Sequence, residues 1–342
     1  MPEAFLALSP TDKAEALQLA SQASGRPMHV LEKDAWVVWA LEVLFSSDFR
    51  DSLVFKGGTS LSKAYQIIQR FSEDVDITYD IRSLVPDMAA ESPNALPSNR
   101  SQEKRWTKAI RERLPQWVER AVSPLFAAAI ASENLQAQLR LDGEKLLVKY
   151  NPSSAGTGYI APVVLVEFGA RSTGDPCSPK PVTCDAAPHL PTLAFPSATP
   201  RVMHPERTFW EKATAIHVFC AQGEFRGGHR FARHWYDLAH LYRTGFAASA
   251  SRDRQLRKSV AAHKSIFFAE KRDDGSLIDY DEAVSGRLQL IPTDSQTLNS
   301  LADDYRSMAN DGLFAAVALP WSDLLHTCRL IEQHVNRPSE LR

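Results

Sequence analysis

The sequence predicts a mixed α/β domain followed by a helical domain. Two observations carry this prediction. Short apolar or alternating runs typical of strands lie between helical patterns up to about residue 200, and only helical patterns follow His204. We expect N-terminal helices at residues 1–50 to pack on a core domain at 51–200, with a helical C-terminal domain at 201–342.

Bulk composition bounds the class of protein. The chain of 342 residues is 44% hydrophobic and 23% charged, which is ordinary for a globular protein in water. No run approaches the roughly 18 apolar residues of a membrane span, and the N-terminus lacks the basic start of a signal peptide. We therefore expect a cytoplasmic protein with no membrane partner. The four cysteines show no CxxC pairing, and the net charge of −2 means that any nucleic-acid-binding surface must be local.

The predicted elements of the first domain follow the apolar spacing along the chain. A serine before the first helical pattern is a capping signal, and the Asp-Gly pair in "LQAQLRLDGEKLLVKYN" is typical of a hairpin turn. We expect helices at 9–24, 30–45, 59–70 and 101–131, strands at 52–58, 74–80 and 162–171, and a hairpin at 135–151.

Two loops and a helical tail complete the prediction. Residues 84–100 are rich in proline, serine and asparagine, and residues 172–200 hold seven prolines, so both are expected to be irregular. A loop as long as the second is often functional. Further helices are expected from Pro205, over 229–243, and within 252–272, 294–309 and 319–335.

A glycine turn between the strand at 52–58 and the next helix is the first candidate site. Glycine allows close approach of the backbone to an anion, and the free amides of a helix start point toward it. Hydroxyl groups there can cap the helix or bind a phosphate. The candidates are Gly57, Gly58, Thr59, Ser60 and, one turn on, Lys63. Taken alone, the same pattern also fits an ordinary tight turn.

Two acids on the following strand are the second candidate site. Asp74 and Asp76 are two residues apart, so both side chains leave the same face, with Cα atoms about 6.5–7 Å apart. This spacing suits carboxylates that converge on Mg²⁺ or Mn²⁺ ions roughly 3.5–4 Å apart, as in two-metal phosphoryl transfer. A solvated strand face is the alternative for the pair alone. Glycine turn, helix and acid pair lie within about 20 residues, which together favours a phosphate site beside a metal site.

Glu167 is a candidate third acid. It is the one charge in the apolar run "VVLVEFG", and a buried carboxylate requires a partner or a metal. If this strand neighbours the strand of Asp74 and Asp76, Glu167 joins the metal site. A salt bridge at the strand end, for example with Arg171, is an equally good interpretation.

Two basic segments are candidate surfaces for RNA. Basic side chains with interleaved tryptophans can hold a phosphate backbone and stack a base, although the pattern fits a solvated helix face with Trp106 and Trp117 in the core somewhat better. The basic residues of the first segment are Arg100, Lys104, Arg105, Lys108, Arg111, Arg113 and Arg120. Those of the second are Arg226, Arg230 and Arg233.

Five blocks of sequence resemble one family, in the family's order. They are "EKD" at 32–34, "KGGTSLSKAY" at 56–65, "RFSEDVDI" at 70–77, "ERTFWEKATAIH" at 206–217 and "RHWYDLAHL" at 233–241. The blocks look like those of the AbiEii/AbiGii toxin family of nucleotidyltransferases, which includes the MenT toxins. The resemblance implies a polymerase-β-like nucleotidyltransferase core with a mixed sheet and a helical C-terminal domain.

The resemblance also implies an activity and its residues. Family members are toxins of toxin–antitoxin or abortive-infection pairs that transfer nucleotides from an NTP to RNA, characteristically tRNA 3′ ends. Carried over, it places Gly58 and Thr59 on the triphosphate, Lys212 on the nucleotide and Asp237 at a final acidic position, while Ser72, Asp74 and Asp76 form the metal motif. A cognate antitoxin is expected as partner. One residue departs from the pattern, because His234 follows Arg233 where many members have an acid.

Other interpretations of these residues stay open at this stage. Without the resemblance, Lys212 would be expected to pair with a neighbouring acid, and Arg233 with Asp237 four residues later would form a helix salt pair. The departure at His234 allows a catalytically inactive module that binds NTP and a partner protein. A metal-dependent nuclease could use the same acids, but it needs no triphosphate site at a glycine turn.

Overall fold

The chain forms two compact units, which we call the sheet unit and the helical unit. The computed structural model describes residues 2–154, 161–222, 231–310, 313–314 and 318–337. The sheet unit consists of Met1–Tyr65, Phe71–Ala95 and Lys104–Met203. The helical unit consists of Gln66–Arg70, Leu96–Glu103 and His204–Arg342. The three-part division expected from the sequence stays a prediction, because compactness does not show which segments fold independently.

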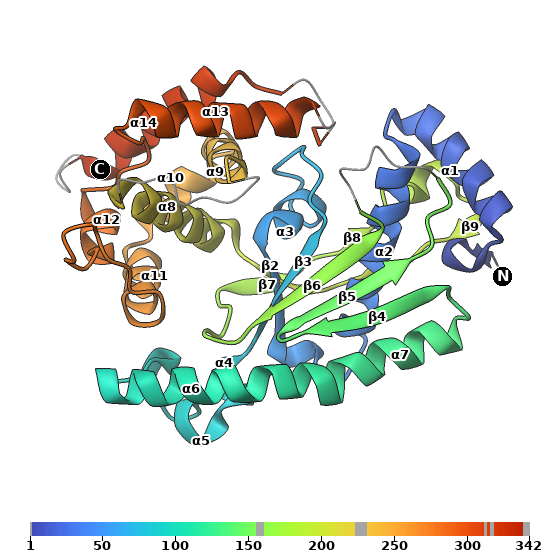
Figure 1. Ribbon diagram of the computed structural model, residues 1–342, viewed down its shortest axis with the longest axis horizontal. Helices are drawn as coiled ribbons and strands as arrows, with labels where there is room; N and C mark the ends of the chain where they lie inside the picture. Colours follow the sequence, from blue (N-terminus) through green and yellow to red (C-terminus); the bar gives the residue numbers. More distant parts are fainter. Residues whose placement is uncertain (1, 155–160, 223–230, 311–312, 315–317, 338–342) are drawn as a thin grey trace. The chain divides into compact units, whose positions relative to one another are not determined.

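One seven-stranded mixed sheet forms the centre of the sheet unit, with the strand order β4-β5-β6-β3-β2-β11-β7 (Figure 1). Its strands are β2 (Leu53–Lys56), β3 (Asp74–Tyr79), β4 (Ala137–Asp142), β5 (Lys145–Tyr150), β6 (Val163–Gly169), β7 (Cys177–Pro179) and β11 (Arg201–Met203). β3 is parallel to β6 and β11 is parallel to β2, whereas the other neighbouring strands are antiparallel. The predicted mixed α/β fold class is confirmed.

Alternation of side chains explains why β3 forms a strand with one covered face. Val75 and Ile77 are fully buried, while Asp74 and Asp76 on the opposite face are only partly covered. The predicted hairpin of β4 and β5 is also confirmed. Its two-residue turn holds Gly143 at a φ of 60°, a backbone region that glycine enters without steric cost.

Helices cover the apolar face of the sheet. The sheet unit holds α1 (Pro10–Ser24), α2 (Met28–Phe45), α3 (Gly57–Lys63), α4 (Ile81–Leu84), α5 (Pro86–Ala89), most of α6 (Arg100–Trp117) and α7 (Ser123–Ser132). The ring of Trp117 stacks on Tyr79, with centroids 4.1 Å apart, and Trp36 of α2 stacks on Tyr150 at 5.1 Å. Because Tyr79 shares the face of Val75 and Ile77, these contacts leave the face of the two acids uncovered by α6.

The helix predicted over residues 59–70 differs from the observed one. α3 begins at Gly57 and ends at Lys63, so residues 66–70 are not helical. Gln66 has a φ of 53°, which is incompatible with a continuing α-helix. Arg70 explains the break, because its guanidinium binds Asp237 inside the helical unit. A distant ion pair here overrides the local helical pattern.

The two segments predicted to be irregular contain short elements. The segment 84–100 includes α5 and a 3-10 turn, and the proline-rich segment holds β7, β8 (Val182–Thr183), β9 (Leu193–Ala194) and β10 (Ser197–Ala198). β7 pairs with β11, β8 with β10, and β9 with β1 (Glu3–Ala4). Each of these strands is only two or three residues long. Prolines between them limit their length, since proline cannot donate to a ladder.

The helical unit contains seven α-helices in its described residues. They are α8 (Pro205–Ala221), α9 (Arg233–Arg243), α10 (Phe246–Arg252), α11 (Arg254–Phe267), α12 (Tyr280–Ser285), α13 (Ser295–Asn310) and α14 (Trp321–Asn336). The short helices α10 and α12 were not predicted. Two fully buried tryptophans anchor the core, since the indole of Trp210 donates to Ala250 O at 3.1 Å and that of Trp235 to Leu290 O at 2.8 Å. In the described part of the chain, no helix is long and apolar enough to cross a membrane.

Candidate active site

The acid pair of β3 lies on the partly exposed face of the sheet, as predicted. Neighbouring strands place two more charged residues beside Asp76. Lys56 on β2 and Glu167 on β6 are its register partners on either side. Side chains of register partners leave the same face of a sheet. Asp76 therefore lies between a lysine and a glutamate on this face.

Glu167 lies beside Asp76, which is the arrangement required of a third acid, but its side chain is not buried. Its strand does neighbour β3, and it lies directly across from Asp76. The expectation of a buried carboxylate is wrong, because the Glu167 side chain is 44% exposed. Its ion-pair partner is Lys145 on β5 at 3.5 Å, rather than Arg171. Its role as a metal ligand stays a prediction.

The donor set fits a magnesium ion that is shared with a bound phosphate. Among the described residues, no three His, Cys, Asp or Glu side chains are grouped closely enough to hold a metal ion by themselves. Magnesium commonly takes one or two protein carboxylates and completes its shell with water and substrate phosphates. Asp74 and Asp76 provide such carboxylates on one face. The chemistry of the site therefore suits Mg²⁺ or Mn²⁺ together with a nucleotide, and not a cage made by protein alone.

Gly57 brings the backbone of the turn against the carboxylate of Asp76. Its φ is 79°, and a Cβ atom on this residue would lie 2.1 Å from Asp76 Oδ2 and 2.9 Å from Asp76 Cγ. No side chain larger than hydrogen fits there without moving the carboxylate. The predicted closeness of the glycine turn and the acid pair is thus present in the structure.

The hydroxyl groups of the turn are engaged within the protein. Thr59 and Ser60 are fully buried. The Thr59 hydroxyl hydrogen-bonds with the carbonyl of Asp74 and, at 2.9 Å, with the hydroxyl of Ser72. The Ser60 hydroxyl donates to Gly57 O at 2.9 Å. These bonds connect the start of α3 to the start of β3, and phosphate binding by the three hydroxyls stays a prediction.

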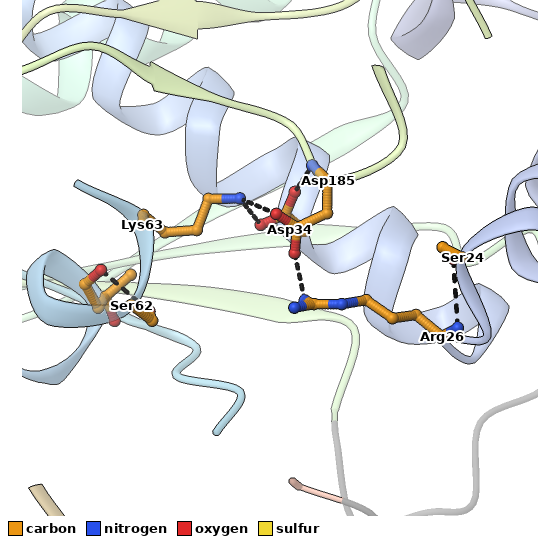
Figure 2. A network of polar contacts seen from close by, with 7 residues as sticks. Ser24, Arg26, Asp34, Ser62, Lys63 and Asp185 are labelled. Carbon is orange, nitrogen blue, oxygen red and sulfur yellow. Dashed lines mark hydrogen bonds and ion pairs between the residues drawn. The ribbon is translucent and has the colours of Figure 1, made fainter. Parts of the chain in front are cut away.

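Lys63 lies in a partly buried ionic network (Figure 2). Its Nζ atom is 2.6 Å from Asp34 Oδ1 and 2.7 Å from Asp185 Oδ1. Asp34 also accepts a bond from the amide of Asp185 at 2.6 Å, and Arg26 forms an ion pair with Asp185. Burial alone would lower the pKa of Lys63, but the two carboxylates raise it, so the ammonium stays charged. In this structure Lys63 binds carboxylates, and its proposed contact with a phosphate stays untested.

Three consecutive charged residues of α2 connect the segments around the acid pair. Glu32, Lys33 and Asp34 are all buried. The Glu32 carboxylate accepts from the amide and, at 2.8 Å, from the hydroxyl of Ser153. Lys33 forms an ion pair with Glu73, the residue before β3, and donates to Ala161 O at 2.9 Å. Three charges within an apolar helix are a signal of buried partners that the sequence offers without any resemblance.

A second buried ionic cluster lies in the helical unit and contains Lys212 and Asp237. Asp237 is fully buried and accepts two bonds from the Arg70 guanidinium, at 2.7 and 2.8 Å. Lys212 Nζ lies 2.8 Å from the same carboxylate. Burial alone would raise the pKa of Asp237, but these two cations hold it well below its usual range. Arg70 was not among the predicted site residues, and the alternative of a helix salt pair between Asp237 and Arg233 did not include it.

His234, the residue that departs from the family pattern, lies beside this cluster. Burial, followed by the charges of Lys212 and Arg233, lowers its pKa far below the usual value, so the imidazole is neutral. Its buried Nδ1 has no hydrogen-bond partner within the described part of the chain. A neutral ring replaces the negative charge that an acid would bring here. The cluster of Arg70, Lys212 and Asp237 therefore holds two cations against one anion.

The two tryptophans of the first basic segment are covered to different degrees, and Trp117 is only partly buried. Trp106 is 2% exposed. Trp117 stacks on Tyr79 and contacts Phe49 and Phe168 edge to face. Of the two interpretations, the structure supports a helix whose rings are internal and whose basic residues are external. Arg226 and Arg230 of the second basic segment lie outside the described residues.

Comparison with known proteins identifies the family. The family model for the nucleotidyl transferase AbiEii toxin of type IV toxin–antitoxin systems matches residues 39–326. The chain belongs to this family. The nucleotidyltransferase toxin MenT4 from Mycobacterium tuberculosis H37Rv is similar in structure, with 18% sequence identity and a TM-score of 0.46 over 97% of this chain and 91% of that chain. No curated protein matches the sequence. The family inferred from the motifs is confirmed, and its toxin–antitoxin character implies an antitoxin partner.

Gly57→Ala is expected to impair nucleotidyl transfer in a folded protein. The new Cβ displaces the Asp76 carboxylate, and the positive φ costs about 1–2 kcal/mol in a residue with a Cβ. We expect a melting temperature lower by a few degrees and a transfer rate about 100-fold lower. Gly143→Ala is the matched control, since Gly143 also has a positive φ and no atom would lie within 4 Å of its Cβ. If both variants kept full activity, the contact of Gly57 with Asp76 would have no catalytic importance.

Asp237→Asn is expected to destabilise the protein by about 3–5 kcal/mol, because Arg70 and Lys212 would remain buried as like charges. Asp303→Asn is the control, since its exposed pair with Arg306 contributes about 0–1 kcal/mol.

Folding lowers the pKa of Asp237, so its charge stabilises the fold above a pH of about 4 and this effect is lost as the pH falls further. Urea unfolding at several pH values should show the difference from wild type shrinking in acid. A constant difference would contradict this assignment.

Proposed function

We propose that the protein transfers a nucleotide from an NTP to the 3′-hydroxyl of an RNA acceptor, the 3′ end of a tRNA, as the toxin of a toxin–antitoxin pair. The observation that supports this most is the packing of the Gly57 backbone against Asp76, beside Asp74 on one strand face. Family membership supports the reaction class. The choice of RNA rests on the resemblance of the sequence motifs.

The reaction is an in-line displacement at phosphorus. The acceptor 3′-oxygen attacks the α-phosphate, the bond between the α- and β-phosphates breaks, pyrophosphate leaves, and the hydroxyl proton passes to solvent. Asp74 and Asp76 would hold Mg²⁺ or Mn²⁺, with Glu167 as a further ligand. When bound, the metal neutralises charge on the phosphates and lowers the pKa of the attacking hydroxyl. The absence of a side chain at Gly57 leaves room for the triphosphate beside the two carboxylates.

Lys212 and Asp237 have separate roles in this proposal. Lys212 is assigned to the nucleotide by its position in the family motif, and not by a distance. Asp237 is fully buried and binds Arg70 and Lys212, so we assign it to positioning the lysine rather than to binding metal. An ammonium oriented by a buried carboxylate loses little freedom when it binds a phosphate oxygen.

A catalytically inactive module that binds NTP and an antitoxin is the second candidate. The neutral, buried His234 favours it, since an acid of the family pattern is missing there. Intact carboxylates on β3 favour catalysis. The two candidates differ in one observable, because an inactive module would bind NTP and release no pyrophosphate. Both functions require NTP, and we propose that the protein acts in the cytoplasm.

Asp76→Asn is expected to abolish nucleotide incorporation into RNA without unfolding the protein. The substitution preserves shape but removes the charge needed at the metal, and we expect a loss of at least ~1000-fold, about 4 kcal/mol in transition-state energy. Asp142→Asn, at an exposed strand end of the hairpin, is the control and should be unchanged. Labelled NTP, Mg²⁺ and total RNA provide the assay, with melting temperature measured in parallel. Wild-type incorporation by folded Asp76→Asn would contradict the proposed site.

A further inference from the structure

Helix α6 presents a row of exposed basic side chains on the sheet unit. Lys104, Lys108 and Arg111 are spaced at i, i+4 and i+7, so they lie on one side of the helix. All three are exposed, and the side chain of Lys108 is 78% exposed. From the rise of an α-helix, the row extends over about 10 Å. We call these three residues the α6 row.

The opposite side of α6 is buried, which sets the direction of the α6 row. Trp106, Ala109, Ile110 and Leu114 are the buried residues of the helix. A helix held in this way cannot rotate its basic side inward without exposing a tryptophan and two large aliphatic side chains. The α6 row therefore points outward as a consequence of core packing. Neither tryptophan of the helix belongs to this row, since Trp106 is buried and the ring of Trp117 stacks on Tyr79.

The charge of α6 is locally positive and largely uncompensated. The helix holds six basic and two acidic residues, although the whole chain has a net charge of −2. The remainder of the chain is thus net acidic. Within the described part of the protein, Lys104 and Arg111 form no ion pair with a carboxylate. Lys108 lies 3.9 Å from Glu112, which is too long for a hydrogen bond, and both side chains are exposed. A pair of this kind contributes little and is easily replaced by a phosphate.

We propose that the α6 row binds the phosphate backbone of the RNA acceptor. The inference rests on the proposed function, which requires a polyanionic second substrate. Charge complementarity selects this occupant, because a row of cations that includes neither tryptophan of its helix suits repeated phosphates better than a stacked base. Contacts to phosphates position a nucleic acid without reading its sequence. The α6 row therefore supplies affinity and salt dependence, while selection of the RNA arises elsewhere.

The test compares two triple variants in RNA binding. Lys104→Ala, Lys108→Ala and Arg111→Ala are combined, and the control combines Arg50→Ala, Arg140→Ala and Lys149→Ala, which removes the same charge from other exposed positions of the sheet unit. Both are made in the Asp76→Asn protein, so that no turnover occurs. Binding of deacylated total tRNA is measured by fluorescence anisotropy at several salt concentrations. We expect the α6 variant to bind at least ~10-fold more weakly at 0.1 M salt, with a logarithmic salt slope smaller by about 2–3.

Two outcomes overturn the proposal. One is unchanged affinity and slope in the α6 variant, which would leave an acidic protein partner as the occupant. The other is an equal loss in the control, which would show that only net charge matters.

In catalytically intact protein, the α6 variant should raise the KM for tRNA about 10-fold and keep kcat within twofold. Binding is measured without NTP, so a wild-type protein that binds tRNA but transfers no nucleotide contradicts the proposed function and leaves the α6 row supported.

Discussion

The arrangement of the candidate site depends on the buried charges of one helix, α2. Glu32, Lys33 and Asp34 have partners in three different segments: the chain after β5, the residue before β3, and the network of Lys63 and Asp185. Buried ion pairs add little net stability, but removing one partner costs about 3–5 kcal/mol, because the other charge is left without compensation. The triplet therefore acts mainly by selecting one position for each segment. Since Glu73 precedes Asp74 directly, this constraint extends to the acid pair.

The turn around Gly57 limits where the carboxylate of Asp76 can lie. A Cβ at Gly57 would overlap the carboxylate of Asp76, and buried hydroxyls connect α3 to the backbone of β3. These contacts define the backbone from which both carboxylates extend before any ligand binds. Preorganised charge of this kind contributes to catalysis because little reorganisation is needed during the reaction. In the helical unit, the ammonium of Lys212 is likewise held in place by the buried carboxylate of Asp237.

Local patterns were sufficient to predict some of these features and not others. Alternation predicted β3 and the shared face of Asp74 and Asp76, and the glycines predicted a close backbone approach, because both depend on neighbours in sequence. The partners of Lys63 and Asp237 could not be predicted in this way. Asp185 is 122 residues from Lys63, and Arg70 is 167 residues from Asp237. The early end of α3 has the same origin, since Gln66 leaves the helix where the chain turns toward the Arg70 ion pair. The condition that the strand of Glu167 neighbours β3 is met, but the apolar residues around Glu167 in sequence wrongly suggested a buried side chain.

The most direct test of nucleotidyl transfer at this site follows the two ends of the triphosphate. Each NTP is supplied with a label in either the α- or the γ-phosphate, together with the protein, Mg²⁺ and deacylated tRNA. The account predicts that label from the α-phosphate enters the RNA, with release of an equal amount of pyrophosphate, and that label from the γ-phosphate does not enter. Label in the RNA from the γ-phosphate would show phosphoryl transfer instead, and shortened RNA without label would show a nuclease. Either result would contradict nucleotidyl transfer at this site.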